Sequence, residues 1–150
     1  MRVSARADYA VRAVIEIAAA SPALIKADQI AEAQNIPIKF LENILSDLRR
    51  AGIVRSKRGA EGGYVLGFDS ADLSVAHIMR AVEGPLAWVR DERPGVVHYQ
   101  GSAEGLEEVW VAVRASLRSV VDHVTIDDLV KHRLPKAVTR LTKDPQAWVD

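Results

Sequence analysis

Polar and charged residues recur between Pro37 and Ala51 at spacings that place them along one face of a helix. Together they offer ammonium, carboxylate, amide, hydroxyl and guanidinium groups. The residues that carry these groups are Lys39, Glu42, Asn43, Ser46 and Arg49. Such groups form hydrogen bonds with base edges and bind phosphate oxygens. This pattern predicts a helix that reads a nucleic-acid groove, although for Glu42 an ordinary solvent-exposed carboxylate remains the alternative.

The opposite face of the same helix is apolar. Leucine and isoleucine recur at i, i+3, i+4 and i+7, namely Leu41, Ile44, Leu45 and Leu48, which predicts burial against a core. A shorter helix over residues 27–34 precedes it. Asn35 favours a left-handed turn after that helix, and Pro37 suits the first turn of the next. The two helices therefore predict a helix-turn-helix.

A hairpin is expected directly after this pair of helices. Residues 53–56 and 64–66 have strand composition, and Gly59, Gly62 and Gly63 lie between them. The hairpin would form a wing. The segment 49–58 has five basic residues and no acidic one, namely Arg49, Arg50, Arg55, Lys57 and Arg58. We expect Arg58 to enter a groove and the other four to meet phosphates, whereas a solvated basic run is the alternative.

The remaining segments divide the chain into four parts. We predict a winged helix-turn-helix DNA-binding domain over 1–84, with helices over 4–20 and 74–83, and a sensor-type loop over 85–102. A dimerisation helix region follows over 103–132, with its long helix over 103–123, and a C-terminal tail covers 133–150. The fold class is therefore mainly α with a small β-hairpin.

The long helix suggests a homodimer. Its apolar residues keep heptad-like spacing and are Leu106, Val109, Trp110, Val113, Leu117 and Val120. A helix of this length next to a small domain has too little partner surface in its own chain, and a second copy would supply it. Packing across its own domain is the alternative.

Composition limits the other classes of function. Apolar residues make up 49% and charged residues 27%, and the net charge is zero. Residues 1–67 nevertheless carry ten basic and seven acidic side chains, a surplus of +3 on the expected DNA-facing half. No apolar run is long enough for a membrane span and no signal peptide precedes the first helix, so we expect a cytoplasmic protein. Catalytic motifs are missing, and we expect no enzyme.

Three segments resemble a known family: YAVRAV at 9–14, IPIKFLENILSDLRRAGIVRSKRGAEGGYVL at 36–66 and SVAHIMRAVEGPL at 74–86. They are similar to the bacterial Rrf-two-type winged-helix transcriptional regulators, the family of IscR, NsrR and CymR. The resemblance covers about residues 1–130. It implies a homodimeric regulator, commonly a repressor, that binds an imperfect palindrome in double-stranded DNA. It further implies base discrimination by Glu42, minor-groove insertion of Arg58 and a wing tip formed by Gly62 and Gly63.

The chain departs from this family in its cysteines. Cluster-binding members place three cysteines after the EGPL-like sequence, and this chain has none. Asp8 matches a fourth cluster ligand of some members, but here it lacks the thiolates. We therefore expect no cysteine-ligated iron–sulfur cluster, no other cofactor and no metal.

The sequence is compatible with several kinds of controlling signal. An apolar effector could lie beneath the loop, between Trp88, Tyr99 and Trp110, or these residues could belong to a dimer core. A protein effector is another alternative. Two further functions are alternatives: an adapter that keeps the fold without binding DNA, and a metal sensor that uses Asp8, His98 and nearby acidic residues.

Overall fold

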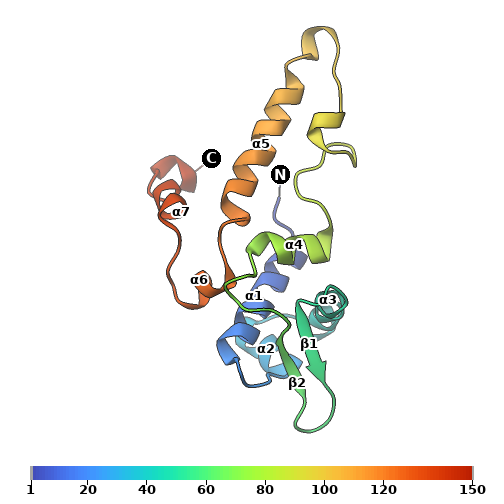
Figure 1. The fold of residues 1–150 in the computed structure, drawn as a ribbon, viewed down its shortest axis with the longest axis vertical. Helices are drawn as coiled ribbons and strands as arrows, with labels where there is room; N and C mark the ends of the chain where they lie inside the picture. Colours follow the sequence, from blue (N-terminus) through green and yellow to red (C-terminus); the bar gives the residue numbers. More distant parts are fainter. Residues whose placement is uncertain (1, 150) are drawn as a thin grey trace.

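The computed structural model describes residues 2–149, and its winged part has the expected elements (Figure 1). These are α1 (Ala5–Ala20), α2 (Ala27–Gln34), α3 (Ile38–Arg50), β1 (Val54–Lys57), β2 (Gly63–Leu66) and α4 (Val75–Glu83). The later elements are α5 (Leu106–Val121), α6 (Ile126–Val130) and α7 (Lys136–Leu141). Short 3₁₀ turns cover Pro94–Val96, Gly101–Ala103 and Pro145–Trp148. The mainly helical fold with one hairpin confirms the predicted class.

Local sequence signals set most helix ends. The Ser4 hydroxyl accepts a hydrogen bond from the Ala7 amide at 3.0 Å and caps α1. Ser74 and Thr125 cap α4 and α6 in the same way. Asn35 adopts the left-handed conformation after α2, with φ of 49° and ψ of 51°, as predicted for the turn. The chain therefore passes from α2 to α3 within three residues.

The core of the winged domain lies between α1, α3 and α4. Small residues of α1, such as Ala10 and Ala13, are fully buried and allow the helices to approach closely. The apolar stripe of α3 is buried in the same cluster. Ile126 of α6 is also fully buried there. The end of the predicted segment 103–132 thus packs with residues 2–84, and "winged domain" below means residues 2–84 together with α6.

The wing is a two-stranded antiparallel sheet. Val54 pairs with Leu66 and Lys57 with Gly63, so the turn covers residues 58–62. A third segment joins its edge: the Tyr64 amide donates to the Ile25 carbonyl at 2.7 Å, and the Ile25 amide donates to the Tyr64 carbonyl at 3.1 Å. The wing is thereby tied to the segment just before α2.

The loop 85–102 and α5 form an arm that rises from the winged domain (Figure 1). The turn Pro94–Val96 packs on α5. No residue of α5 is buried, in contrast to the helices of the core. Among residues 2–149, no helix has the length and apolar character needed to cross a membrane.

Candidate nucleic-acid interface

The polar face of α3 is open to solvent. Lys39, Glu42 and Asn43 are exposed and Ser46 is half-buried, while the apolar face of the helix is sealed in the core. The structure therefore presents these four predicted residues together on one accessible surface. Their donors and acceptors are free to meet base edges and phosphates.

An ionic contact fixes the end of α3 to its neighbours. The Asp47 carboxylate pairs with Arg6 of α1 and, at 3.1 Å, with Arg50. Arg6 also donates to the Val82 carbonyl of α4 at 3.1 Å. The orientation of α3 is thus tied to α1 and α4. Arg50 remains 78% exposed despite its ion pair, so its guanidinium is accessible to a phosphate.

A second contact holds the helix-turn-helix against α1. The Arg12 guanidinium donates to the Gln34 side-chain oxygen at 3.0 Å and to the Gln34 carbonyl at the end of α2. It also pairs with Asp8 at 2.9 Å and lies over the Tyr9 ring. Asp8, the residue that matches a cluster ligand in the family, therefore has a partner within its own helix.

The wing brings its cations to the end of α3. Arg55, Lys57 and Arg58 are exposed, and Arg49 of α3 donates to the Ser56 hydroxyl at 3.4 Å across the gap. A hollow of about 390 Å³ lies between the two elements. Its wall includes Arg49, Lys57 and Arg58, so a concave basic surface joins recognition helix and wing. Such a surface favours a polyanion.

Lys26 also lines this hollow, and the sequence did not reveal it. It lies directly before α2, and the pairing of Ile25 with Tyr64 carries it to the wing. A single Lys in a mixed segment has no local signal that distinguishes it from any exposed Lys. Only the long-range pairing of Ile25 with Tyr64 of the wing places Lys26 in the same hollow as Arg58.

The two wing glycines have a steric function. A Cβ at Gly62 would lie 2.2 Å from the Lys57 carbonyl oxygen, and one at Gly63 would lie 2.7 Å from the Ile25 carbonyl oxygen. Gly63 also has φ of 152°. Both positions therefore require glycine for closure of the wing, whether or not their backbones contact DNA.

The aromatic pair beside α3 is structural in part. Tyr9 and Phe40 pack edge to face with ring centroids 5.7 Å apart. Tyr9 is partly buried and packs against the core, whereas Phe40 remains 40% exposed.

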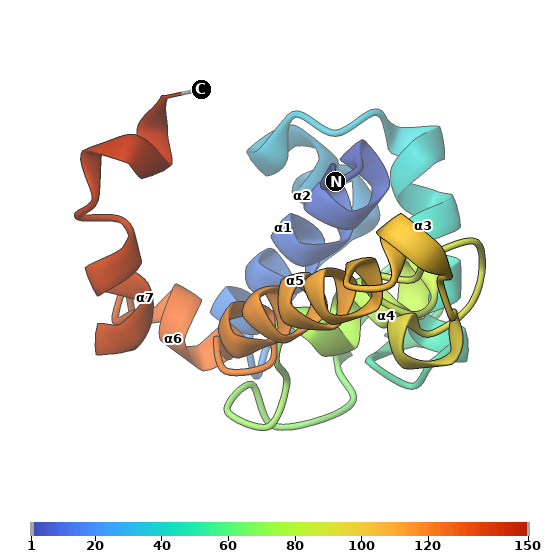
Figure 2. The same ribbon diagram turned by 90° about the horizontal axis from the view of Figure 1, so that it is seen from above.

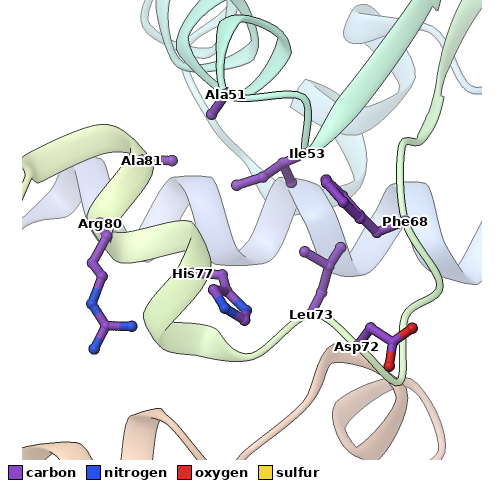
Figure 3. Close-up of a pocket in the computed structure, with 8 residues that line it drawn as sticks. All are labelled: Ala51, Ile53, Phe68, Asp72, Leu73, His77, Arg80 and Ala81. Carbon is purple, nitrogen blue, oxygen red and sulfur yellow. The ribbon is translucent and has the colours of Figure 1, made fainter.

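A mainly apolar hollow of about 370 Å³ lies behind the recognition helix, between the end of α3, Phe68 and α4 (Figure 3). Ile53, Leu73 and the His77 ring line it, while the Arg80 guanidinium points away from them. Arg80 instead pairs with Asp122 at 2.7 Å. No local sequence signal predicts this hollow, because its wall comes from three separate elements.

The residues predicted for dimerisation divide between two roles. Leu117 packs against the winged domain beside Met79 and Leu86, and Trp110 and Val113 line a hollow of about 300 Å³ with the loop. Leu106 and Val120 are half-buried, and Val109 is exposed. Val111 and Ala115 are exposed as well. The exposed Val109, Ala112 and Ser116 lie on one line along α5 with the half-buried Val120, and these four residues are called the accessible stripe below.

The aromatic residues of the loop are only partly brought together. Trp88 and Trp110 share the hollow of about 300 Å³, but Tyr99 does not line it. Tyr99 instead lies under the Arg90 guanidinium. The predicted three-aromatic pocket is thus a two-tryptophan hollow.

The donors considered for a metal are separately engaged. His98 pairs with Glu107 at 3.1 Å and is mostly exposed, and Asp8 pairs with Arg12. Within residues 2–149, no three His, Cys, Asp or Glu side chains form a group that could hold a metal ion. With no cysteine in the chain, these residues do not fit a thiolate-held iron cluster.

An ion-pair network joins the winged domain to the arm. Asp122, just after α5, accepts hydrogen bonds from Arg80 of α4 and from Arg118 of α5, both at 2.7 Å. Burial by itself raises the pKa of Asp122. The hydrogen bonds and positive charges of Arg118 and Arg80 together outweigh burial and hold this pKa below its ordinary value.

Comparison with known proteins shows where this arrangement recurs. The sequence model of the Rrf2 family, described as an iron-dependent transcriptional regulator, matches residues 3–132. A relative from Mycobacterium tuberculosis, named as an HTH-type transcriptional regulator, is 46% identical over 148 residues, which is 98% of this chain and 92% of the relative. The HTH-type regulator CymR of Bacillus subtilis is 33% identical over 138 residues, which is 88% of this chain and 91% of CymR.

Solved structures agree with the sequence comparisons. CymR, described as the global cysteine regulator of B. subtilis, superposes with a TM-score of 0.75 at 32% identity over 88% of this chain and 98% of CymR. IscR of T. potens superposes with a TM-score of 0.72 at 31% identity over 88% of each chain. The winged domain and the arm are therefore shared with transcriptional regulators.

Proposed function

Because the chain belongs to the Rrf2 family of transcriptional regulators, we propose that it acts as a homodimer that binds an imperfect palindrome in double-stranded DNA and represses transcription there. The relatives are regulators and not enzymes. The observation that carries the proposal is the concave basic surface on which Arg49 of α3 meets Lys57 and Arg58 of the wing. It gives one protomer a recognition helix and a wing with a continuous phosphate-binding surface between them.

In this proposal α3 enters the major groove. Lys39, Glu42, Asn43 and Ser46 would meet base edges, and Arg58 would enter the flanking minor groove. Lys26, Arg49, Arg50, Arg55 and Lys57 would bind phosphates. Two protomers would place two recognition helices about one helical turn of DNA apart.

The test is selection of DNA from a fragmented genomic pool with purified protein in excess competitor DNA, followed by footprinting. We expect an enriched sequence with two related half-sites, their centres roughly 10 base pairs apart. No enrichment would favour the adapter function on the same fold. A reporter gene behind the selected site then tests repression, and higher expression in the presence of the protein would contradict it.

Glu42 offers a sharper test of base reading. A carboxylate accepts a hydrogen bond from the cytosine amino group. Glu42→Ala should therefore relax discrimination at one base pair in each half-site, by about tenfold. Binding to every single-base variant of the operator should be measured. An equal loss for all variants would remove Glu42 from base reading.

Control in the proposal acts without a cysteine-ligated cluster. The two-tryptophan hollow within the arm is the place for an apolar effector, because Trp88 comes from the loop and Trp110 from α5. Binding there would move the arm relative to the winged domain and change operator affinity. A screen of apolar metabolites by tryptophan fluorescence tests this, with the double variant Trp88→Phe and Trp110→Phe as control. A signal change that this variant retains would come from Trp148 and would place the effector elsewhere.

A further inference from the structure

The C-terminal tail, residues 133–149, is joined to α6 by the Arg133 amide, which donates to the Asp128 carbonyl at 2.8 Å. Among residues 2–149, α7 has no extensive contact with another helix or strand. All the hydrogen bonds of residues 134–149 within the described chain stay inside the segment. Leu141 is 53% exposed and Trp148 is 74% exposed. Both views show the tail on the side of the winged domain away from α3 (Figures 1 and 2). An ordered segment with exposed apolar residues lacks a partner in its own chain.

The tail is also strongly basic. Residues 133–143 include four basic side chains and no acidic one: Arg133, Lys136, Arg140 and Lys143. None of the four forms an ion pair with another described residue. Their charge is therefore available to an acidic surface.

The arm carries a segment rich in acidic residues, which could bind this basic tail. Residues 91–108, here called the acidic tip, contain five acidic residues and one arginine. Glu104 and Glu108 are exposed and have no ion-pair partner within residues 2–149, while Glu107 pairs only with His98. In the sequence, the tip precedes α5 and includes its first three residues, whereas the tail comes after α5 and α6.

The accessible stripe of α5 indicates how two chains would bring these ends together. Val109 and Val120 lie at its ends, and Ala112 and Ser116 lie in its middle. Antiparallel pairing about the middle places Val109 against the partner's Val120 and Ala112 against the partner's Ser116, which is self-complementary. It also sets the acidic start of each α5 against the basic end of the other, whereas parallel pairing would set like charges side by side.

We propose that the tail of each protomer docks on the acidic tip of its partner and closes the dimer from both ends. The inference rests on the proposed homodimer and names a second interface in it. The family model ends at residue 132, whereas the mycobacterial relative aligns over 98% of the chain. Phosphates of bound DNA are a less suitable partner, because the tail and α3 lie on opposite sides of the winged domain.

The chain contains no cysteine, so introduced cysteines are unique reporters. Ala103→Cys places a thiol at the tip and Ala137→Cys places one on the tail, and both positions are exposed. The two single variants are mixed, allowed to exchange subunits and treated with a short bismaleimide. We expect a covalent dimer whose cross-linked peptides contain positions 103 and 137. Ala60→Cys at the wing tip replaces Ala137→Cys as the matched control and should give no such product.

Charge exchange tests the chemistry of the contact. Lys136→Glu with Arg140→Glu should raise the dimer Kd about 3- to 10-fold at low salt, the range expected for two exposed ion pairs. Adding Glu104→Lys and Glu108→Lys to the same chain should return the dimer Kd to the wild-type value. Lack of rescue, or a loss of operator affinity with the dimer Kd unchanged, would overturn the proposal, the second result by placing the tail on DNA.

The outcomes separate this inference from the proposed function. If the protein forms a dimer and binds its operator but gives no cross-link between 103 and 137, only the tail contact is wrong. If sedimentation shows a monomer at all concentrations, the homodimer and the tail contact are both wrong.

Discussion

The winged domain and the arm differ in how far they bury their apolar residues. In the winged domain, Ile17, Ile44 and Ile78 are fully buried within one chain. In the arm, α5 has 16 residues and none of them is buried. The winged domain is therefore complete as one copy, while in the proposed homodimer a second molecule would cover the arm.

This contrast separates the candidate DNA-binding surface from the proposed site of control. The basic surface for DNA is built entirely from the self-contained part, so its geometry does not depend on a partner. In the proposed homodimer, the spacing between two such surfaces would depend on contacts that the arms make between chains. A signal that acts on the arm would then change DNA binding without altering α3 itself.

The largest expected effect comes from breaking the arm alone. Val109→Asp places a charge on the accessible stripe of α5 and should raise the dimer Kd more than about 100-fold, because an unpaired charge would be desolvated in the interface. Operator affinity should fall with it. Val111→Asp is the matched control, since Val111 is also exposed but lies about 200° around the helix from Val109. Equal loss in both variants, by analytical ultracentrifugation, would contradict the stripe.

The next effect tests the completeness of the winged domain. Gly63→Ala should lower the free energy of unfolding by about 1–3 kcal/mol, because its Cβ would meet the Ile25 carbonyl oxygen at 2.7 Å. Urea denaturation measures the change. Gly95→Ala, in the loop, has open space around its Cβ and should change stability little. A neutral Gly63→Ala would mean that the wing closes without this steric requirement.

A smaller effect separates the two regions by charge. Arg58→Ala should weaken operator binding about tenfold and reduce the slope of log affinity against log salt by about one, since a cation in the minor groove also displaces a counterion from the DNA. Arg93→Ala, which removes an exposed cation of the loop, should leave both quantities unchanged. Fluorescence anisotropy over a salt series gives the slopes. Similar slopes for wild type and Arg58→Ala would place this side chain off the DNA.

The smallest effect concerns the junction between the regions. Because the pKa of Asp122 is lowered in the folded protein, its ionised form stabilises the fold above the unfolded pKa of about 3.9, and this contribution disappears as pH falls through the lower folded pKa. Asp122→Asn should therefore cost about 0.5–1 kcal/mol at pH 6 and less below pH 4. Urea midpoints at both pH values measure it. A cost that grows in acid would reverse the assigned sign.

Local sequence signals were sufficient for the elements of the fold. Ser4, Asn35, Ser74 and Thr125 mark helix ends through hydrogen bonds and dihedral angles that involve only a few neighbouring residues. The two faces of α3 follow from its 3.6-residue period alone. The tail was less predictable, because its two prolines interrupt any long apolar period and α7 is only six residues long.

Periodicity and turn chemistry act over short distances along the chain, and they are sufficient to predict a winged helix-turn-helix with a basic wing and a long apolar helix. Which side chains share a surface depends on the tertiary structure. In the folded chain, Lys26 lies beside the wing and Asp8 forms an ion pair with Arg12. Leu117 packs against the winged domain, and only part of the predicted apolar face of α5 is accessible. These outcomes depend on contacts between residues far apart in the chain, and no local spacing encodes them.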